Sequence, residues 1–255
     1  DARLLVCGLC DLAPGRLAGI CGQEMPAALH VELERRLDRR LSGEPLQYIE
    51  GAAYFMGLKF AVDSRVLIPR QDTETLCEQA LTFLRGYTGA EVLDLCTGSG
   101  AIAISVARLQ PGLRVTATDM SSDALSVASE NAHLNGVYVR FMQGDLFEPV
   151  AGERFDAILC NPPYLTADDM VHLQTEVACE PRMALFGGED GLMFYRRLAH
   201  EVYGHLKPGG YALFEVGDGQ AAEVLRLMSE NAMCAASGTV KDLPGVERVV
   251  WIRSR

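Results

Sequence analysis

The pattern of apolar and polar positions divides the chain into two parts, and the first part is helical. An apolar run from Ala2 to Cys10 is followed by Pro14-Gly15, which breaks a helix. Further on, apolar residues recur at helical spacing with charged residues between them, at Leu29, Val31, Leu33, Leu37 and Leu41. Gly43 ends this helix. From Tyr48 to Ile68, β-branched and aromatic residues become frequent and predict a short hairpin.

From about residue 73 the pattern changes to alternating helices and strands. The predicted strands cover residues 91–95, 114–118, 137–142, 155–160, 211–216 and 247–252. The predicted helices cover 73–84, 101–109, 121–134, 191–206 and 220–230, with Ser121 and Asp190 as caps. This alternation predicts an α/β fold with a mostly parallel sheet covered on both faces. Ligands of such sheets bind at the carboxyl ends of the strands.

One of these strand ends carries an unusual turn, Asn161-Pro162-Pro163-Tyr164. Prolines cannot donate to a strand ladder, so the strand must end here in a rigid turn. A short amide, a fixed backbone carbonyl and an aromatic ring then lie together. Two acceptors and a stacking ring suit a flat NH2 group, either of adenine or of an amide. The alternative is an ordinary strand-terminating turn, but the position at a buried strand end favours a functional role.

Three further strand ends carry candidate ligand-binding residues. The first predicted strand leads through a glycine-rich turn, Cys96-Thr97-Gly98-Ser99-Gly100, whose glycines let the backbone approach a ligand. Asp119 lies about twenty residues further on, where a carboxylate can bind both hydroxyls of a ribose. Asp145, followed by Leu146, can accept from an adenine amino group. Each acid alone is equally well a capping carboxylate, but their occurrence in strand order indicates a nucleoside site.

The charge and the lengths of the apolar runs limit the kinds of partner that we expect. The chain has a net charge of −11, and residues 71–255 supply all of it, with fourteen basic and twenty-five acidic residues. Residues 1–70 balance at nine of each. A nucleic-acid enzyme normally shows a basic surface, so nucleic acid is disfavoured as the main partner. No apolar run approaches the roughly 20 residues of a membrane span. The first residue is Asp rather than Met, which leaves open whether the native N-terminus, with any targeting signal it carries, is missing.

Eight cysteines are scattered through the chain and indicate a reducing, cytoplasmic environment. Cys7 and Cys10, with Cys21 and His30 beyond, are open to interpretation as a zinc site. The cysteines fall among apolar residues in a helical pattern, and no second C-x-x-C pair follows. We therefore expect no metal site and no nucleophilic triad.

Taken together, the glycine-rich turn, Asp119, Asp145 and the Asn161–Tyr164 turn resemble S-adenosylmethionine-dependent methyltransferases that act on exocyclic or amide nitrogen. Two further stretches narrow the resemblance. Glu44-Pro45-Leu46-Gln47-Tyr48-Ile49 with the segment from Val66 to Glu74 is similar to the linker of the peptide chain release factor glutamine methyltransferases. Glu180-Pro181, with Ala184-Leu185 and Gly188 to Gly191, is similar to the same family. The resemblance covers essentially the whole chain.

The resemblance implies a helical N-terminal substrate-docking domain at 1–50, a β-hairpin linker at 51–72 and a Rossmann-like methyltransferase domain at 73–255 with a seven-stranded sheet. It implies S-adenosyl-L-methionine as cofactor, bound by Cys96, Thr97, Gly98, Ser99, Gly100, Asp119, Asp145, Leu146 and Asn161. Catalysis falls to Asn161, Pro162, Pro163 and Tyr164. The implied substrate is the glutamine of the Gly-Gly-Gln loop in class I peptide chain release factors, methylated at N5.

One position departs from the family. The family usually has Gly where this chain has Cys96, and a Cβ there either crowds the methionine part of the cofactor or points away.

Three alternatives to release-factor methylation stay open: an adenine-N6 nucleic-acid methyltransferase, a glutamine methyltransferase of a ribosomal protein, and a non-catalytic cofactor-binding module. The acidic catalytic part argues against the first, the N-terminal segment against the second, and the intact Asn161–Tyr164 turn against the third.

Overall fold

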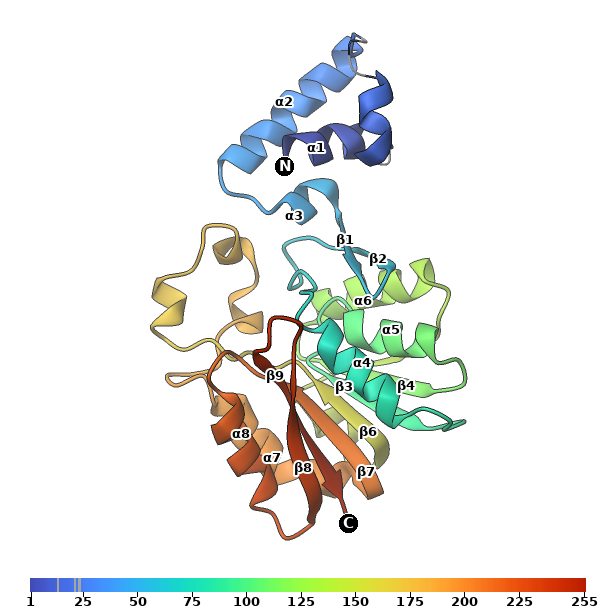
Figure 1. Cartoon of the computed structure of the whole chain (residues 1–255), viewed down its shortest axis with the longest axis vertical. Helices are drawn as coiled ribbons and strands as arrows, with labels where there is room; N and C mark the ends of the chain where they lie inside the picture. Colours follow the sequence, from blue (N-terminus) through green and yellow to red (C-terminus); the bar gives the residue numbers. More distant parts are fainter. Residues whose placement is uncertain (13, 21, 23) are drawn as a thin grey trace.

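A computed structural model of the chain describes residues 1–12, 14–20, 22 and 24–255. Its N-terminal part is helical, with α1 (Ala2–Leu9), a 3-10 turn η1 (Pro14–Ile20), α2 (Ala27–Leu41) and α3 (Leu46–Glu50). These helices lie at one end of the molecule, above the sheet (Figure 1). Gly43, with φ of +94°, follows the end of α2 as expected. Cys21, part of the alternative zinc site, lies outside the described residues.

A short antiparallel hairpin connects the helices to the rest of the chain. Strand β1 (Ala52–Phe55) pairs with β2 (Leu58–Ala61), with Ala52 opposite Ala61. The two turn residues, Met56 and Gly57, both have positive φ, as the tight turns that match strand twist require. An extended segment then leads to α4 (Glu74–Phe83).

Seven strands form one large sheet within the described residues. They are β3 (Glu91–Leu95), β4 (Arg114–Asp119), β5 (Arg140–Gln143), β6 (Phe155–Cys160), β7 (Leu206–Glu215), β8 (Cys234–Lys241) and β9 (Glu247–Ser254). Their order is β5-β4-β3-β6-β7-β9-β8, with β9 antiparallel to both of its neighbours and the other pairings parallel. The predicted α/β fold with a seven-stranded, mostly parallel sheet is confirmed.

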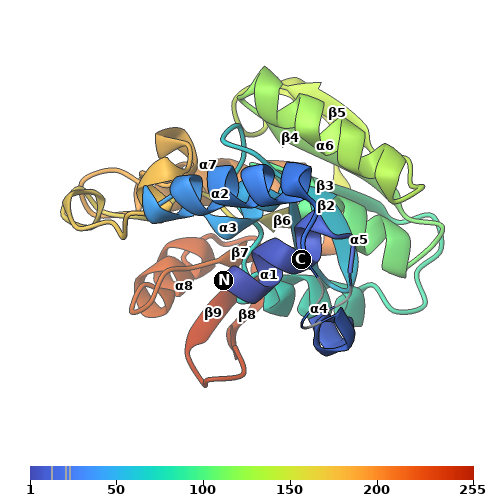
Figure 2. The ribbon, with the colours of Figure 1, turned by 90° about the horizontal axis from the view of Figure 1, so that it is seen from above.

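Helices cover both faces of this sheet (Figures 1 and 2). Alternate strand residues explain why: Val92 packs in a core with α4, α5 (Ala101–Leu109) and α6 (Ser122–Leu134). Leu93, the next residue, packs on the other side with α7 (Met193–His205) and α8 (Ala221–Ser229). Because successive side chains of a strand point to opposite faces, a continuous apolar run fills both cores.

Several element bounds differ from the predicted ones. Strand β8 was not predicted, because its residues Cys234–Lys241 carry a Ser-Gly pair and few large apolar side chains. Helix α7 starts at Met193 rather than at 191, since Asp190 accepts from the backbone N–H of Leu192 in a turn before the helix. Strand β7 begins at Leu206, earlier than predicted, and includes Pro208-Gly209-Gly210 before its apolar run.

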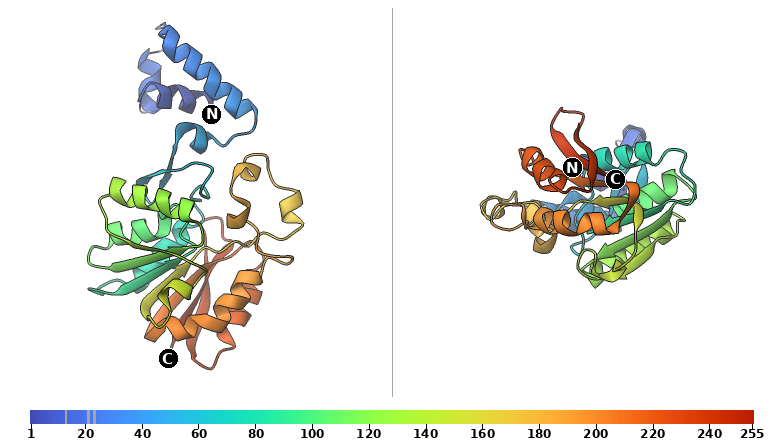
Figure 3. Two further views of the ribbon diagram at one scale, coloured as in Figure 1. Left: turned by 180° about the vertical axis from the view of Figure 1, so that it is seen from behind. Right: turned by 90° about the horizontal axis from the view of Figure 1, so that it is seen from below.

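The connection between β6 and α7 is long and reaches the N-terminal helices (Figure 3, left). It contains the short 3-10 turns η3 (Asp169–Val171), η4 (Val177–Cys179) and η5 (Arg182–Ala184). Arg40 on α2 forms an ion pair with Glu176, and the Cys179 thiol lies 3.7 Å from the carbonyl oxygen of Gly43. This β6–α7 connection thus joins the helical part to the sheet at the carboxyl ends of the strands.

Candidate functional site

The carboxyl ends of β3, β4 and β6 open into a cavity of about 510 Å³. This volume falls in the roughly 300–1,000 Å³ range of small-molecule sites. Of the predicted cofactor residues, the cavity is lined by Cys96, Gly98, Asp119, Asp145, Leu146 and Asn161. The structure therefore brings together residues from four separate strand ends. It adds residues that sequence reasoning missed, among them Met120, Ser121, Phe186 and Phe194.

The glycine-rich turn divides into residues that face the cavity and residues that hold the turn. A Cβ on Gly98 would meet no described protein atom within 4 Å, so the backbone there is open to a ligand. Thr97 and Ser99 are buried instead. The Thr97 hydroxyl donates to Asp94 at 2.6 Å, and a Cβ on Gly100 would lie 2.7 Å from Ile104. Predicted residues Thr97, Ser99 and Gly100 thus frame the turn rather than line the cavity.

Cys96 occupies a left-handed backbone position, with φ of +57°. This conformation suits glycine and costs an ordinary residue about 1–2 kcal/mol. Its side chain lines the cavity and also lies against Cys160, the last residue of β6. Burial raises the pKa of the Cys160 thiol, and the neighbouring Cys96 thiol raises it further. The Cβ that departs from the resembled family therefore sits at the cavity wall.

The two predicted acids of the cavity are held differently. Asp119 accepts from the backbone N–H of Gly98 at 2.8 Å and of Ser121 at 2.9 Å. Burial raises the pKa of Asp119, while these N–H groups lower it. Asp145 instead pairs with Arg197 on α7 at 2.7 Å. Because a carboxylate has about four acceptor positions, both acids keep oxygen lone pairs for a ligand.

At the Asn161–Tyr164 turn both prolines are buried, and Asn161 and Pro163 line the 510 Å³ cavity. Asn161 and Tyr164 also line a neighbouring cavity of about 370 Å³, which the β6–α7 connection encloses. Burial raises the pKa of the Tyr164 hydroxyl. Asn161 is therefore a wall that the two cavities share.

Glycines and one glutamine hold this turn from behind. A Cβ on Gly187 would lie 2.7 Å from the Pro163 carbonyl oxygen, and one on Gly191 would lie 2.4 Å from the Tyr164 carbonyl oxygen. Gln220 donates to the same Tyr164 oxygen at 3.0 Å. Gly187 and Gly191 thus lie where backbone packs directly on backbone, which leaves no room for side chains.

Glu180 ties the linker to the site. Its carboxylate accepts from the backbone N–H of Ile68 at 3.0 Å and pairs with Arg70, and its side chain is 1% exposed. The Tyr48 hydroxyl donates to the carbonyl oxygen of Val66 at 2.6 Å. Since Val66 lines the 510 Å³ cavity, these three contacts position the linker as one of its walls.

Two buried polar residues near the site were missed from the sequence. Asn131, on α6, bonds the backbone of Ala61 and the carbonyl oxygen of Ser99. Glu215 ends β7 beside Asn161 and is 1% exposed. A charged residue inside the apolar run from Tyr211 to Val216 was the available signal for Glu215.

Two buried carboxyls have strongly raised pKa values. Burial raises the pKa of Asp94 to about 7, and the Thr97 hydroxyl and Ala103 N–H offset part of this effect. Burial likewise raises the pKa of Glu215 to about 7. Neither carboxyl is among the residues that line the 510 Å³ cavity; Asp94 lies behind the glycine-rich turn, where it accepts from Thr97, and Glu215 lies beside Asn161. Buried acids with perturbed pKa values are common close to functional sites. Among the described residues, no group of three or more His, Cys, Asp and Glu side chains could hold a metal ion.

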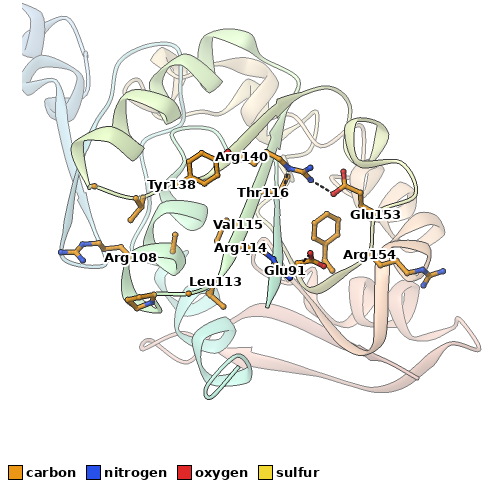
Figure 4. A pocket seen from close by; sticks show the side chains of 16 residues that line it. Glu91, Arg108, Leu113, Arg114, Val115, Thr116, Tyr138, Arg140, Glu153 and Arg154 are labelled. Atoms are coloured by element: carbon orange, nitrogen blue, oxygen red, sulfur yellow. Dashed lines mark hydrogen bonds and ion pairs between the residues drawn. The ribbon is translucent and has the colours of Figure 1, made fainter. Parts of the chain in front are cut away.

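A separate cavity of about 710 Å³ lies at the opposite edge of the sheet, near the amino ends of β3, β4 and β6 (Figure 4). Two local ion pairs lie among its lining residues, Arg114 with Glu91 and Arg140 with Glu153. None of the predicted site residues lines it. The predicted site residues that line a cavity therefore lie at the carboxyl edge of the sheet.

Comparison with protein families gives two matches. Residues 73–200 match the family model described as Methyltransferase small domain. Residues 1–51 match the model described as PrmC N-terminal domain.

Among curated proteins, the release factor glutamine methyltransferase of Geobacter sulfurreducens is 45% identical over 213 residues, covering 83% of this chain and 74% of that protein. The protein of the same name from Moorella thermoacetica is 42% identical over 226 residues, covering 88% and 80%. Among solved structures, a Pyrococcus furiosus methyltransferase gives a TM-score of 0.56 at 22% identity, covering 86% of this chain and 98% of that one. The Thermus thermophilus 16S rRNA N2 G1207 methyltransferase, in complex with AdoMet and guanosine, gives 0.58 at 20% identity, covering 80% and 50%.

Proposed function

The chain belongs to the release factor glutamine methyltransferases, and from this premise we propose that it transfers a methyl group from S-adenosyl-L-methionine to N5 of a protein glutamine. The substrate we propose is the glutamine of the Gly-Gly-Gln motif of class I peptide chain release factors. The position of Asn161 carries this proposal: it lines both the 510 Å³ and the 370 Å³ cavity. A residue placed there can touch a methyl donor on one side and an acceptor on the other.

The larger cavity fits S-adenosylmethionine. Open backbone at Gly98 and free lone pairs on Asp119 suit the amino-acid and ribose parts. Apolar walls from Leu146 and Phe194 suit a flat base, and Asp145 lies beside them to accept from its amino group. When bound, S-adenosylmethionine supplies an electrophilic methyl group on a sulfonium.

We propose that Asn161 and Pro162 bind the reacting amide. An amide nitrogen is a poor nucleophile because its lone pair is delocalised into the carbonyl. The Asn161 side-chain oxygen and the Pro162 carbonyl accept its two hydrogens and aim the lone pair at the larger cavity. Positioning of this kind removes much of the entropic barrier, and the acceptors stabilise the positive charge that develops on nitrogen. Tyr164 packs on the flat amide, and Pro163 keeps the turn rigid.

The domain division and cellular setting are part of the proposal. Residues 1–50 dock the substrate, residues 51–72 link, and residues 73–255 carry the transfer. The ion pair between Arg40 and Glu176 supports a docking role for the helical part, because Glu176 lies between Gln174 and Val177, which line the 370 Å³ cavity. Within the described residues, no helix is long and apolar enough to cross a membrane. We propose that the protein works in the cytoplasm, where release factors act.

A labelled-methyl transfer assay tests the function. The purified protein is incubated with S-adenosylmethionine and a class I release factor, its Gln→Ala variant at the Gly-Gly-Gln motif, a ribosomal protein or DNA. We expect label only on the release factor with its glutamine intact. Label that persists after the glutamine is replaced, or that appears on DNA, overturns the proposal.

Asn161→Ala tests the role of that residue in the same assay. We expect transfer to fall below detection while S-adenosylmethionine binding, measured by calorimetry, changes little. Wild-type turnover in this variant would remove Asn161 from the mechanism. Tyr138→Ala, at the opposite edge of the sheet, is the control expected to keep full activity.

A further inference from the structure

Glu215 and Asn161 lie side by side at the ends of neighbouring strands. Cys160 on β6 is in register with Phe214 on β7, so the next residues of both strands are adjacent. Thr73, just before α4, completes the group and is also buried. The Asn161 Nδ2 group donates to the Thr73 hydroxyl at 3.3 Å. The Thr73 hydroxyl and the Asn161 carboxamide also lie close enough to the Glu215 carboxylate that both lower its pKa.

We infer that Glu215, acting with Thr73, is a positioning residue that decides which end of the Asn161 carboxamide faces the substrate. This inference rests on the proposed function and names a residue beyond the Asn161–Tyr164 turn. An ionised carboxylate only accepts hydrogen bonds. Beside Glu215, the NH2 end of Asn161 must therefore turn inward, and the Oδ1 end turns towards the cavities.

The orientation matters because the two ends of a carboxamide are nearly equal in size. With Oδ1 outward, Asn161 accepts a hydrogen of the substrate amide. With NH2 outward, two donors would meet, and the substrate nitrogen would be repelled rather than held. The Thr73 hydroxyl fits the same scheme, since it accepts from Asn161 and so keeps its own hydrogen to donate towards Glu215. While Glu215 is ionised, the donor and the acceptor of each hydrogen bond in this group are therefore fixed.

Burial of the Glu215 carboxylate lowers the stability of the fold, which favours a functional role for this residue. Among the described residues, the Glu215 Oε2 atom has no hydrogen-bond partner although it is buried. An unsatisfied buried oxygen destabilises the fold. A glutamine or an apolar residue would fill the same space at lower cost, but neither would exclude the flipped Asn161.

The charged and titratable groups that face Glu215 come from several elements: Asp72 before α4, Cys77 on α4, Cys160 on β6, Tyr164 of the turn, Tyr195 on α7 and Arg248 on β9. Asp72 raises the Glu215 pKa and Arg248 lowers it, while burial is the dominant cause of its rise to about 7. Protonation gives Glu215 a donor that can bind Asn161 Oδ1. Turnover of the wild type should therefore fall as the pH drops through about 7.

The test compares Glu215→Gln, Thr73→Val and Thr73→Ser with the wild type on a release factor. We expect Glu215→Gln and Thr73→Val to lower kcat by about tenfold, the effect of one misdirected hydrogen bond, with the KM for S-adenosylmethionine within about twofold. Thr73→Ser keeps the hydroxyl and should keep kcat within about threefold. Ser105→Ala removes a buried hydroxyl on α5 and is the control expected to change nothing. Thermal unfolding checks that every variant is folded.

Two readouts separate positioning from a structural role. The fall of kcat below about pH 7 should be absent in Glu215→Gln. In the ligand-free protein, the side-chain amide resonances of Asn161, assigned by their loss in Asn161→Ala, should shift through the same pH range in the wild type and not in Glu215→Gln. Unchanged kcat and unchanged amide titration in a folded Glu215→Gln overturn the inference. A wild type that does not methylate release factors refutes the proposed function, and the amide titration still decides the inference.

Discussion

At the scale of single residues, two non-glycine positions at the cavity have left-handed backbones. Cys96 has φ of +57° and Leu146 has φ of +47°. A left-handed backbone at a non-glycine residue costs free energy and persists only where the surrounding structure holds it in place. Thr118 donates to the carbonyl oxygen of Leu146 at 3.2 Å, and the Thr97 N–H bonds the carbonyl oxygen of Thr118 at 3.1 Å. Neighbouring strand ends thus hold both strained turns in place.

Replacement of Cys96 measures this strain. Cys96→Ala and Cys96→Gly both remove the thiol, so their difference isolates the backbone. We expect the glycine variant to be more stable than the alanine variant by about 1 kcal/mol, because only alanine keeps the left-handed penalty. In a chain of this size that is about 2–4 °C in the unfolding midpoint. Equal midpoints, or a more stable alanine variant, would show that residue 96 is not strained.

At the scale of elements, Asn131 joins parts of the chain that are far apart in sequence. Its Nδ2 group donates to the carbonyl oxygens of Ala61 at 3.0 Å and Ser99 at 2.9 Å, and its Oδ1 accepts from Ala61 at 2.6 Å. One buried side chain on α6 therefore connects the hairpin to the glycine-rich turn.

Asn131→Ala should destabilise the protein by about 3 kcal/mol, because three backbone groups lose their partner. Asn135 is the matched control: it also bonds the hairpin, at the Lys59 carbonyl oxygen, but at an exposed position. Asn135→Ala should cost less than about 1 kcal/mol, since water replaces the bond. Chemical denaturation measures both. Similar losses in the two variants would contradict the dependence on burial.

An element or site residue could be predicted from the sequence where the residues that determine it are close together along the chain. The core strands and the Ser121-capped helix α6 were predicted, since the Ser121 cap is local and indeed accepts from Ala124 at 3.1 Å. Strand β8 was missed because its stability comes from pairing with β9 rather than from its own residues. Asp119 and Asn161 follow predicted strands, so their convergence could be inferred. Glu215, Glu180 and Asn131 act on residues distant in sequence, and their partners became visible only in the fold.

At the scale of the whole molecule, the two buried carboxyls Asp94 and Glu215 set a pH dependence. Their folded-state pKa values of about 7 lie above those of the unfolded chain. Between about pH 4 and 7 the folded protein therefore binds more protons, so stability is lost as the pH rises, by on the order of 3 kcal/mol for each carboxyl. Acids with lowered pKa, such as Asp63 and Asp156, oppose this only below about pH 4.

We expect the thermal unfolding midpoint of the ligand-free protein to decrease as the pH is raised from 5 to 8. Asp94→Asn and Glu215→Gln should each flatten part of this fall, because a neutral amide does not titrate. Calorimetry at several pH values gives the measurement. A midpoint that stays constant from pH 5 to pH 8 in the wild type would mean that neither carboxyl titrates in that range.

Substrate docking is the last property that belongs to the whole molecule. Leu41, at the end of α2, is 84% exposed although it is apolar, and it lies two residues before Gly43, which contacts the β6–α7 connection. If residues 1–50 dock the folded substrate, Leu41→Asp should raise the KM for an intact release factor by about tenfold, the loss of one good contact. It should leave kcat and the KM for a short Gly-Gly-Gln peptide unchanged, because the peptide reaches only the 370 Å³ cavity.

Tyr138→Asp is the matched control, since Tyr138 is also 84% exposed but lies at the opposite edge of the sheet. Equal effects of Leu41→Asp on protein and peptide would place the defect in the transfer site, and no effect on either would exclude this part of α2 from docking.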